Sequence, residues 1–118
     1  MRKGGAFCKA YGLNTRNLAL EYLLENQGLD FAIGNLAKDT GISRPKAYEI
    51  IKSFEKKEIV KKSRMIGKTQ LYLLNKNNSL AKLFLKDFKE CLRIIAESEK
   101  TISNHQASSI GVAYAKNA

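Results

Sequence analysis

Apolar residues in the first third of the chain recur with the period of an α-helix. The pattern predicts a helix over residues 15–26, which stops at Asn26-Gln27-Gly28; glycine suits the left-handed backbone that often follows a helix. Residues 30–33 are too few for a helix and suit a brief extended segment. A second, shorter helix is predicted over residues 35–40. The chain therefore begins with two helices separated by a short strand.

The tripeptide Gly41-Ile42-Ser43 predicts a tight turn followed by a third helix. Glycine can take the left-handed conformation of the turn, and the serine side chain can accept a hydrogen bond from a first-turn N–H group. Pro45 is tolerated in that first turn, where its missing N–H would have no intrahelical partner. We expect this helix over residues 44–57, with an apolar face made by Ala47, Ile50, Ile51 and Phe54.

After residue 58 the period becomes alternating, which is typical of β-strands. Leu71 and Leu73 alternate with Gln70 and Tyr72, and residues 66–68 form a turn between two extended runs. The pattern predicts a two-stranded ribbon over residues 59–74. Basic side chains on its first arm and at its tip make this ribbon a positively charged projection.

A long amphipathic helix is predicted over residues 80–98, after a polar break and a capping Ser79. Some of its apolar residues follow one another at spacings of 3, 4, 3 and 4, the pattern of a coiled coil or helix pair: Ala81, Phe84, Phe88, Cys91 and Ile95. The apolar face is broader than one side of a small domain would cover, so we expect a two-fold dimer. The predicted dimer interface comprises Leu80, Phe84, Phe88, Cys91 and Ile95.

The two ends of the chain carry weaker patterns. Residues 1–13 form an N-terminal extension, and within it residues 6–11 are apolar enough to pack, although the pattern assigns them no place. Residues 101–118 hold a single charged residue, Lys116, and many serines, alanines and asparagines. We expect them to form a flexible tail.

The net charge adds a class of partner to this picture. The chain of 118 residues has 21 Lys and Arg against 11 Asp and Glu, a formal net charge of +10, and 44% of its residues are hydrophobic. That length and composition suit one compact domain, or one domain with an appended helix, and a basic surplus attracts polyanions. No stretch approaches the roughly 18 apolar residues of a membrane span, so we expect a soluble protein without a membrane partner.

Two classes of chemistry find no support in the sequence. Cys8 and Cys91 are far apart and belong to no Cys/His cluster, so we interpret them as free thiols in a reducing cytoplasm and expect no metal site. No catalytic or nucleotide-binding motif is present. The expectation is a protein that is not an enzyme and needs no cofactor.

Residues 33–52 match the helix-turn-helix pattern, in which a small residue lies where two helices cross and a glycine makes the turn. The matching positions are Leu36, Ala37, Gly41, Ile42, Ala47 and Ile50. With the preceding helix and strand and the basic ribbon that follows, residues 14–75 resemble the winged helix-turn-helix domain of small microbial, possibly archaeal, transcriptional regulators. The resemblance implies an α+β, mostly α fold: a three-helix core, a β-hairpin wing and a C-terminal dimerisation helix over residues 79–100.

In that family the third helix enters the major groove of DNA and the wing contacts the backbone or the minor groove. The resemblance therefore assigns DNA contacts on the third helix to Ser43, Arg44, Lys46, Tyr48, Glu49 and Lys52. On the wing it assigns them to Lys61, Lys62, Arg64 and Lys68. Arg44 suits a guanine edge and Glu49 a cytosine amino group, whereas the lysines suit phosphates. Residues 44–68 carry nine basic and three acidic residues, a net +6.

The sequence thus predicts a dimeric, sequence-selective binder of double-stranded DNA in the cytoplasm, associated with the nucleoid. It would act as a transcriptional regulator, and family habit favours a repressor over an activator; a small-molecule effector stays open. One alternative is a winged helix that serves as a protein-interaction module in a larger assembly. Another is a replication, plasmid-maintenance or chromatin protein that binds DNA.

Overall fold

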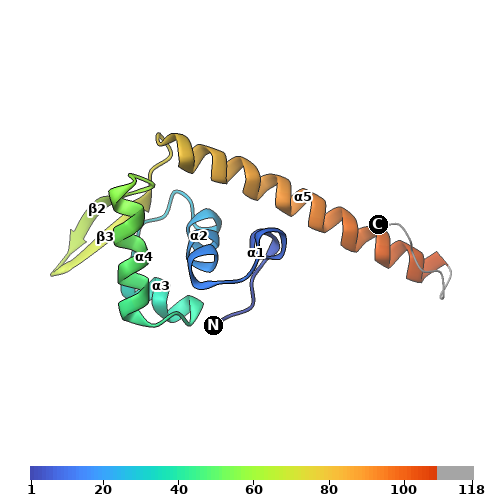
Figure 1. The fold of residues 1–118 in the computed structure, drawn as a ribbon, viewed down its shortest axis with the longest axis horizontal. Coiled ribbons are helices and arrows are strands. Elements are labelled where there is room, and N and C mark those ends of the chain that lie inside the picture. Colours follow the sequence, from blue (N-terminus) through green and yellow to red (C-terminus); the bar gives the residue numbers. More distant parts are fainter. Residues whose placement is uncertain (109–118) are drawn as a thin grey trace.

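The computed structural model describes the backbone of residues 1–108 and the side chains of residues 1–99. Its elements are α1 (Ala6–Tyr11), α2 (Thr15–Glu25), β1 (Phe31–Ala32), α3 (Ile33–Thr40), α4 (Arg44–Lys56), β2 (Val60–Ile66), β3 (Thr69–Leu74) and α5 (Ser79–Ser108). The strands form one antiparallel sheet in the order β1-β3-β2. The β2–β3 hairpin projects from one end of the molecule, and α5 runs away from it toward the other end (Figure 1).

The turn between α3 and α4 forms as the sequence predicts. Gly41 has a φ of 77°, in the left-handed region, and Ile42 is buried beside it. The Ser43 hydroxyl accepts a hydrogen bond from the backbone N–H of Lys46 at 3.3 Å, and Pro45 lies in the first turn of α4. This local chemistry sets the angle between α3 and α4, and the resulting unit is a helix-turn-helix.

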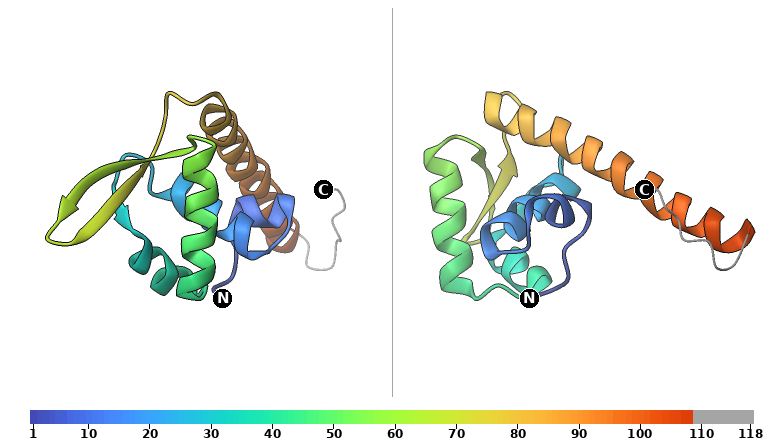
Figure 2. Two further views of the ribbon diagram at one scale, coloured as in Figure 1. Left: turned by 60° about the vertical axis from the view of Figure 1, so that its left-hand side comes forward. Right: turned by 45° about the vertical axis from the view of Figure 1, so that its right-hand side comes forward.

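Helix α2 lies at the centre of the molecule. Every residue from Leu18 to Leu24 is buried, including the polar Glu21, because α1, α3, α4 and α5 all pack against α2. Figure 2 shows α2 between α4 on one side and α1 and α5 on the other. Burial of each large apolar side chain of this kind stabilises the fold by about 1.5–3 kcal/mol.

The wing is anchored at its root and free at its tip. Phe31 of β1 pairs with Tyr72 of β3, and Val60 at the start of β2 pairs with Leu74. Beyond Val60 every residue of β2 is exposed. The register shifts between Lys62 and Met65, where β2 holds one residue more than β3.

Helix α5 is longer than the sequence predicted. It continues to Ser108, ten residues beyond the predicted end at residue 98. No proline or glycine interrupts residues 79–108, and polar residues such as serine and asparagine are tolerated in a helix at small cost. The remaining part of the predicted tail, residues 109–118, lies outside the described residues.

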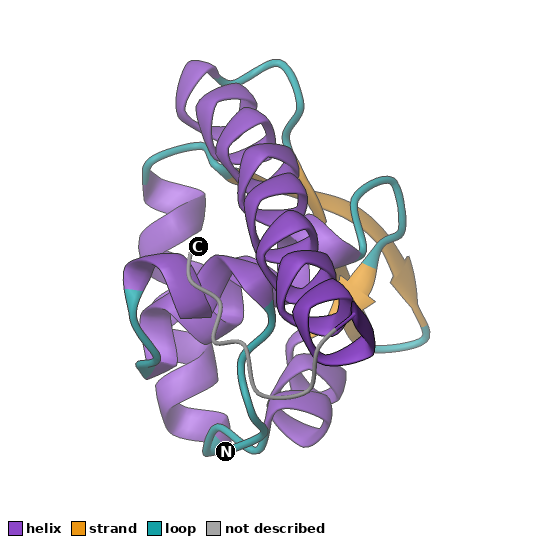
Figure 3. Ribbon diagram, turned by 90° about the vertical axis from the view of Figure 1, so that its right-hand side faces the viewer, coloured by secondary structure: helices purple, strands orange, loops and turns teal. Residues whose placement is uncertain are grey.

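The apolar face of α5 also corrects the predicted dimer interface. Phe88 and Cys91 are only 8% and 7% exposed within a single chain, and Phe84 packs partly against the same core. Helix α5 lies across the outside of the bundle and contacts α1 and α2 (Figure 3). The intrachain packing therefore already covers Phe88 and Cys91, two of the residues predicted at the dimer interface.

That packing depends on α1, which the sequence pattern did not place. The buried carboxylate of Glu21 on α2 accepts hydrogen bonds from the backbone N–H of Gly5, at 2.8 and 3.0 Å, and of Cys8, at 3.0 Å. Arg2 lies 3.6 Å from Glu21 and donates to Glu25 at 2.8 Å. Glu21 thus caps the start of α1 from a neighbouring helix, and its charge is compensated by N–H groups and a guanidinium.

Candidate nucleic-acid interface

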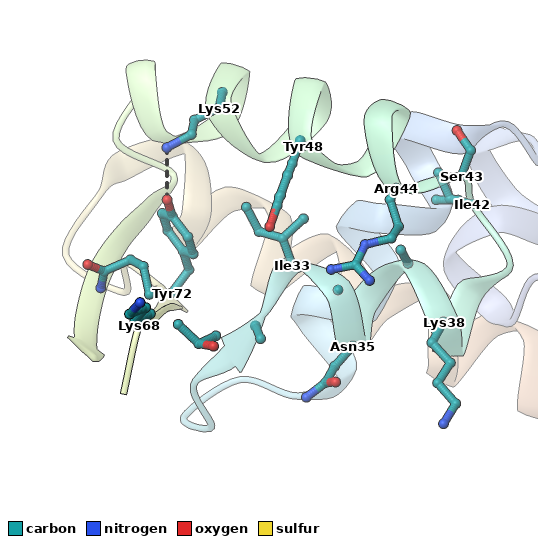
Figure 4. Close-up of a pocket in the computed structure, with 15 residues that line it drawn as sticks. Ile33, Asn35, Lys38, Ile42, Ser43, Arg44, Tyr48, Lys52, Lys68 and Tyr72 are labelled. Carbon is teal, nitrogen blue, oxygen red and sulfur yellow. Dashed lines mark hydrogen bonds between the residues drawn. The ribbon is translucent and has the colours of Figure 1, made fainter. Parts of the chain in front are cut away.

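A groove of about 1060 Å³ opens between α4 and the wing, with the start of α3 as its floor. Its polar lining comes from three elements that are far apart in the sequence: Asn35 and Lys38 of α3, Ser43, Arg44, Tyr48 and Lys52 near or on α4, and Lys68, Thr69, Gln70 and Tyr72 near or on β3. Figure 4 shows these side chains around the groove. The groove therefore gathers four basic residues along one concave surface.

Arg44 reaches from the first turn of α4 toward α3. Its guanidinium lies over Gly34, so close that a Cβ atom at that position would be 3.0 Å from Nη2 of Arg44. Gly34 leaves room for this placement. The side chain is exposed, and its planar fork has donors in the geometry that a bidentate acceptor such as a guanine edge requires.

Lys46 and Glu49 lie outside the groove lining. Their side chains are 3.4 Å apart on the exposed surface of α4, in an i, i+3 ion pair. Glu49 is 70% exposed in this pair and partly neutralises the charge of Lys46. Both remain on the polar side of α4 that the sequence predicted, next to Ser43, whose hydroxyl is used as the helix cap.

Lys52 joins α4 to the root of the wing. Its ammonium donates to the hydroxyl of Tyr72 at 2.9 Å, lies 5.4 Å from the centre of that ring and is 3.5 Å from Glu55. The hydrogen bond with Tyr72 raises the pKa of Lys52, so this side chain stays charged at neutral pH. Tyr72 is nearly buried and presents its hydroxyl at the groove (Figure 4).

The wing residues divide into two groups. Lys61, Lys62 and Lys68 are exposed, and Lys68 lines the groove. Arg64 instead donates from Nε to Asp30 at 2.9 Å, and the hydroxyl of Ser63 donates to the same carboxylate oxygen at 2.8 Å. These two hydrogen bonds lower the pKa of Asp30. Arg64 therefore has a structural partner that its assignment as a DNA contact did not anticipate.

Sequence reasoning missed five polar residues that line the groove: Asn35, Lys38, Thr69, Gln70 and Tyr72. A signal for two of them was present, because alternate residues of a strand share a face and Lys68, Gln70 and Tyr72 are two residues apart. Asn35 and Lys38 point outward from α3 in Figure 4. Their proximity to the wing depends on how β1 pairs with β3, which no local pattern reveals.

The fold defined by this core, sheet and hairpin is the winged helix-turn-helix, as the resemblance implied. Solved structures with this fold include MepR of Staphylococcus aureus, described as a transcription regulator of the multidrug efflux pump MepA. It has 17% sequence identity and a TM-score of 0.58, over 87% of this chain and 81% of that one. MepR has also been solved in complex with DNA, with 12% identity and a TM-score of 0.58 over 86% and 82% of the two chains.

Two further proteins share the architecture. The adhesin competence repressor AdcR of Streptococcus pyogenes has 19% identity and a TM-score of 0.58, over 85% of this chain and 72% of that one. Sso10a-2, a DNA-binding protein from Sulfolobus solfataricus, has 14% identity and a TM-score of 0.52, over 86% and 100% of the two chains. No family model and no curated protein sequence matches the chain.

Two further observations concern membrane spans and metal sites among the residues that the structure describes. No helix among them combines the length and apolar character needed to cross a membrane. Within the same part of the chain, no group of three or more His, Cys, Asp or Glu side chains is arranged to hold a metal ion.

Proposed function

We propose that the protein binds double-stranded DNA through the basic groove and acts as a sequence-selective transcriptional regulator. The observation that carries this proposal is the convergence of Lys38, Arg44, Lys52 and Lys68 from α3, α4 and the wing on one concave surface. Duplex DNA is a polyanion, and neutralisation of its phosphates releases bound counterions and favours binding. The regulators and DNA-binding proteins with the same fold support the same class of partner.

Within this groove, we assign base recognition to Arg44 and phosphate contacts to the lysines. Arg44 has two parallel donors that suit O6 and N7 of guanine in the major groove. Lys52 and Lys68 at the groove, with Lys61 and Lys62 on the wing, carry point charges that suit phosphates and supply affinity without sequence information. Ser43, Lys46, Tyr48 and Glu49 would complete the surface of α4 that faces DNA.

The dimer belongs to the same proposal, with a revised interface. Leu80, Leu83 and Ile94 are 43%, 49% and 51% exposed, and their spacings of 3 and 11 residues place them on one flank of α5. Phe84 and Ile95 are half-buried and share the face of α5 that holds Phe88 and Cys91. Two chains joined through this flank would present two α4 helices to half-sites of a pseudo-palindrome, in the manner of a cytoplasmic repressor bound at the nucleoid.

Band shifts across a salt series test DNA binding directly. The logarithm of the binding constant should fall linearly with the logarithm of the salt concentration, with a slope of about −0.9 for each phosphate contacted. The control is Arg93→Ala, because Arg93 lies on α5 in ion pairs with Glu90 and Glu97, away from the groove. Absence of any shift on duplex DNA at low salt would favour a protein-interaction module instead.

Sequence selectivity is tested by Arg44→Ala. On a duplex selected from a random library, loss of the bidentate contact should weaken binding by roughly 1–3 kcal/mol, with little loss on random DNA. Equal loss on both would favour a sequence-indifferent chromatin or plasmid-maintenance protein. The measurement is the ratio of the two dissociation constants at one salt concentration.

The dimer is tested by light scattering on Leu83→Lys, which places a charge in the exposed flank of α5. The matched control is Leu92→Lys, because Leu92 is 46% exposed but lies on the other flank of the same helix. We expect Leu83→Lys alone to give monomers. A dimer that survives both substitutions would locate the interface elsewhere. Truncation of α5 is a poor test, because Ala81 and Phe88 belong to the core.

A further inference from the structure

The tip of the wing exposes two large apolar side chains. Met65 and Ile66 are 58% and 56% exposed, at the far end of a strand whose residues from Lys61 onward are all solvent-accessible. The nearest basic residues are Arg64, directly before Met65, and Lys68, two residues after Ile66, whereas Lys61 and Lys62 lie nearer the root of the wing. Exposed apolar side chains of this size contribute little to the fold, and their position beside basic residues indicates a surface that contacts a partner.

The structure holds these two side chains in a defined orientation. Gly67, with a φ of 60°, makes the tight turn of the hairpin, and Met65 and Ile66 pair with Gln70 and Thr69 across it. Because consecutive residues of a strand face opposite sides, one apolar side chain lies on each face of the ribbon. A β-bulge before Met65 sets the local twist, and Asp30 holds the bulge through Ser63 and Arg64.

The positive charge around the tip of the wing favours DNA over a second copy of this chain as its binding partner. Basic side chains on both sides of an apolar pair, here Arg64 and Lys68, match the minor groove of a duplex, which has phosphate rims and walls of apolar sugar atoms. A second copy of this chain would bring the same positive wing and be repelled. Gln70 opposite Met65 lines the basic groove, so the tip is continuous with the surface proposed to bind DNA.

We propose that Met65 and Ile66 form a wedge that enters the minor groove and bends the duplex; this inference rests on the proposed binding of DNA. The minor groove of B-DNA is about 6 Å wide, whereas a β-ribbon with side chains on both faces is about 10 Å thick. Insertion therefore requires the groove to widen. Apolar side chains that open the minor groove unstack a base step and bend the duplex toward the major groove.

Ring closure of a short duplex measures this bend without knowledge of the target sequence. A mixed-sequence duplex of about 100 base pairs is shorter than the persistence length of DNA, so ligase closes it slowly unless a bound protein bends it. At a protein concentration that saturates the duplex, the wild-type protein should accelerate closure about tenfold or more. Met65→Ser with Ile66→Ser should abolish the acceleration at a protein concentration at which band shifts show that the variant saturates the duplex.

Two variants make the result specific. Met65→Leu with Ile66→Val keeps two apolar side chains at the tip and should retain ring closure. Leu13→Ser with Leu29→Ser removes two side chains that are 52% and 64% exposed outside the wing, and should also retain it. Band shifts without accelerated closure by the wild-type protein would overturn the wedge but not the proposed function. Absence of any band shift would overturn the proposed function itself.

Discussion

Two carboxylates hold appended elements to the three-helix core, and they differ in how far they are buried. Glu21 is fully buried and anchors α1 through backbone N–H groups of Gly5 and Cys8. Asp30 is near the surface and anchors the wing through Ser63 and Arg64. When a buried carboxylate is removed, its hydrogen-bond donors are left unpaired in a low dielectric. When an exposed carboxylate is removed, water can take its place as the acceptor. We call these two sets of contacts the Glu21 clamp and the Asp30 clamp. The Glu21 clamp therefore governs the stability of the fold, and the Asp30 clamp governs the orientation of the wing.

The largest effect should come from Glu21→Ala. This substitution leaves the N–H groups of Gly5 and Cys8 and the guanidinium of Arg2 without their acceptor inside the protein. We expect a loss of about 3 kcal/mol in the free energy of unfolding, measured by urea denaturation followed by circular dichroism. In this variant α1 should detach from α2, and α5 should lose the part of its packing surface that α1 supplies.

Glu25→Ala is the matched control on the same helix. Glu25 also binds Arg2, but its side chain is 36% exposed and can be replaced by solvent. The free energy of unfolding should therefore change by less than about 1 kcal/mol. A loss as large as that of Glu21→Ala would mean that the ion pair with Arg2, and not the capping of α1, holds the N-terminal segment.

Asp30→Asn should affect DNA binding more than stability. The fold should keep its unfolding midpoint, because this carboxylate is at the surface. The wing should lose its fixed twist, so amide protons of β2 should exchange faster and affinity for DNA should fall several-fold. Ser63→Ala removes one of the two donors and should give a smaller change in the same direction. Unchanged exchange in both variants would show that the bulge needs no clamp.

The pH dependence of the Asp30 clamp follows from the same contact. Hydrogen bonds from Arg64 and Ser63 lower the pKa of Asp30 below its ordinary value of 3.8. A carboxylate with a lowered pKa contributes its stabilisation above that ordinary value and loses it as the pH falls through the folded-state pKa. We therefore expect the carboxyl carbon signal of Asp30 in NMR spectra to titrate below the usual range, with the wing ordered throughout the neutral range.

The smallest effect concerns the thiol next to the Glu21 clamp. Burial, with the nearby carboxylate of Glu21, raises the pKa of the Cys8 thiol to about 11. Burial likewise raises the pKa of Cys91. Both thiols should stay protonated and react slowly with a disulfide reagent at about pH 8, and they should react at the normal rate in urea. Fast reaction of Cys8 in the native protein would show that α1 opens frequently.

The helix-turn-helix could be predicted from the sequence because its signals are local. A left-handed glycine, a serine cap and a proline in the first turn act within five residues, from Gly41 to Pro45. The hairpin turn at Gly67 is similar. The seam of α5 could not be interpreted in the same way. Its apolar spacing requires a partner surface, but the pattern is identical whether that surface is a second chain or the chain's own α1.

The residues of the candidate site likewise divide into those that local signals predict and those that depend on tertiary contacts. Arg44, Lys52 and Lys68 could be assigned from the motif, because the order of helix, turn and wing fixes which segments face the same side. The partner of Arg64 could not, since Asp30 is 34 residues away in the sequence. Asn35 and Lys38 join the groove only because β1 pairs with β3 and brings the start of α3 to the root of the wing.

By itself, the sequence determined the existence of α2, α3 and α4, the turn and the wing, and the concentration of positive charge on α4 and the wing, because these depend on short-range backbone chemistry and on composition. The tertiary structure alone decided which apolar faces meet and which charges are paired. It assigned Phe88 and Cys91 to the core and Arg64 to a clamp. The physical reason is that burial and ion pairing depend on distances between residues remote in sequence, which periodicity does not encode.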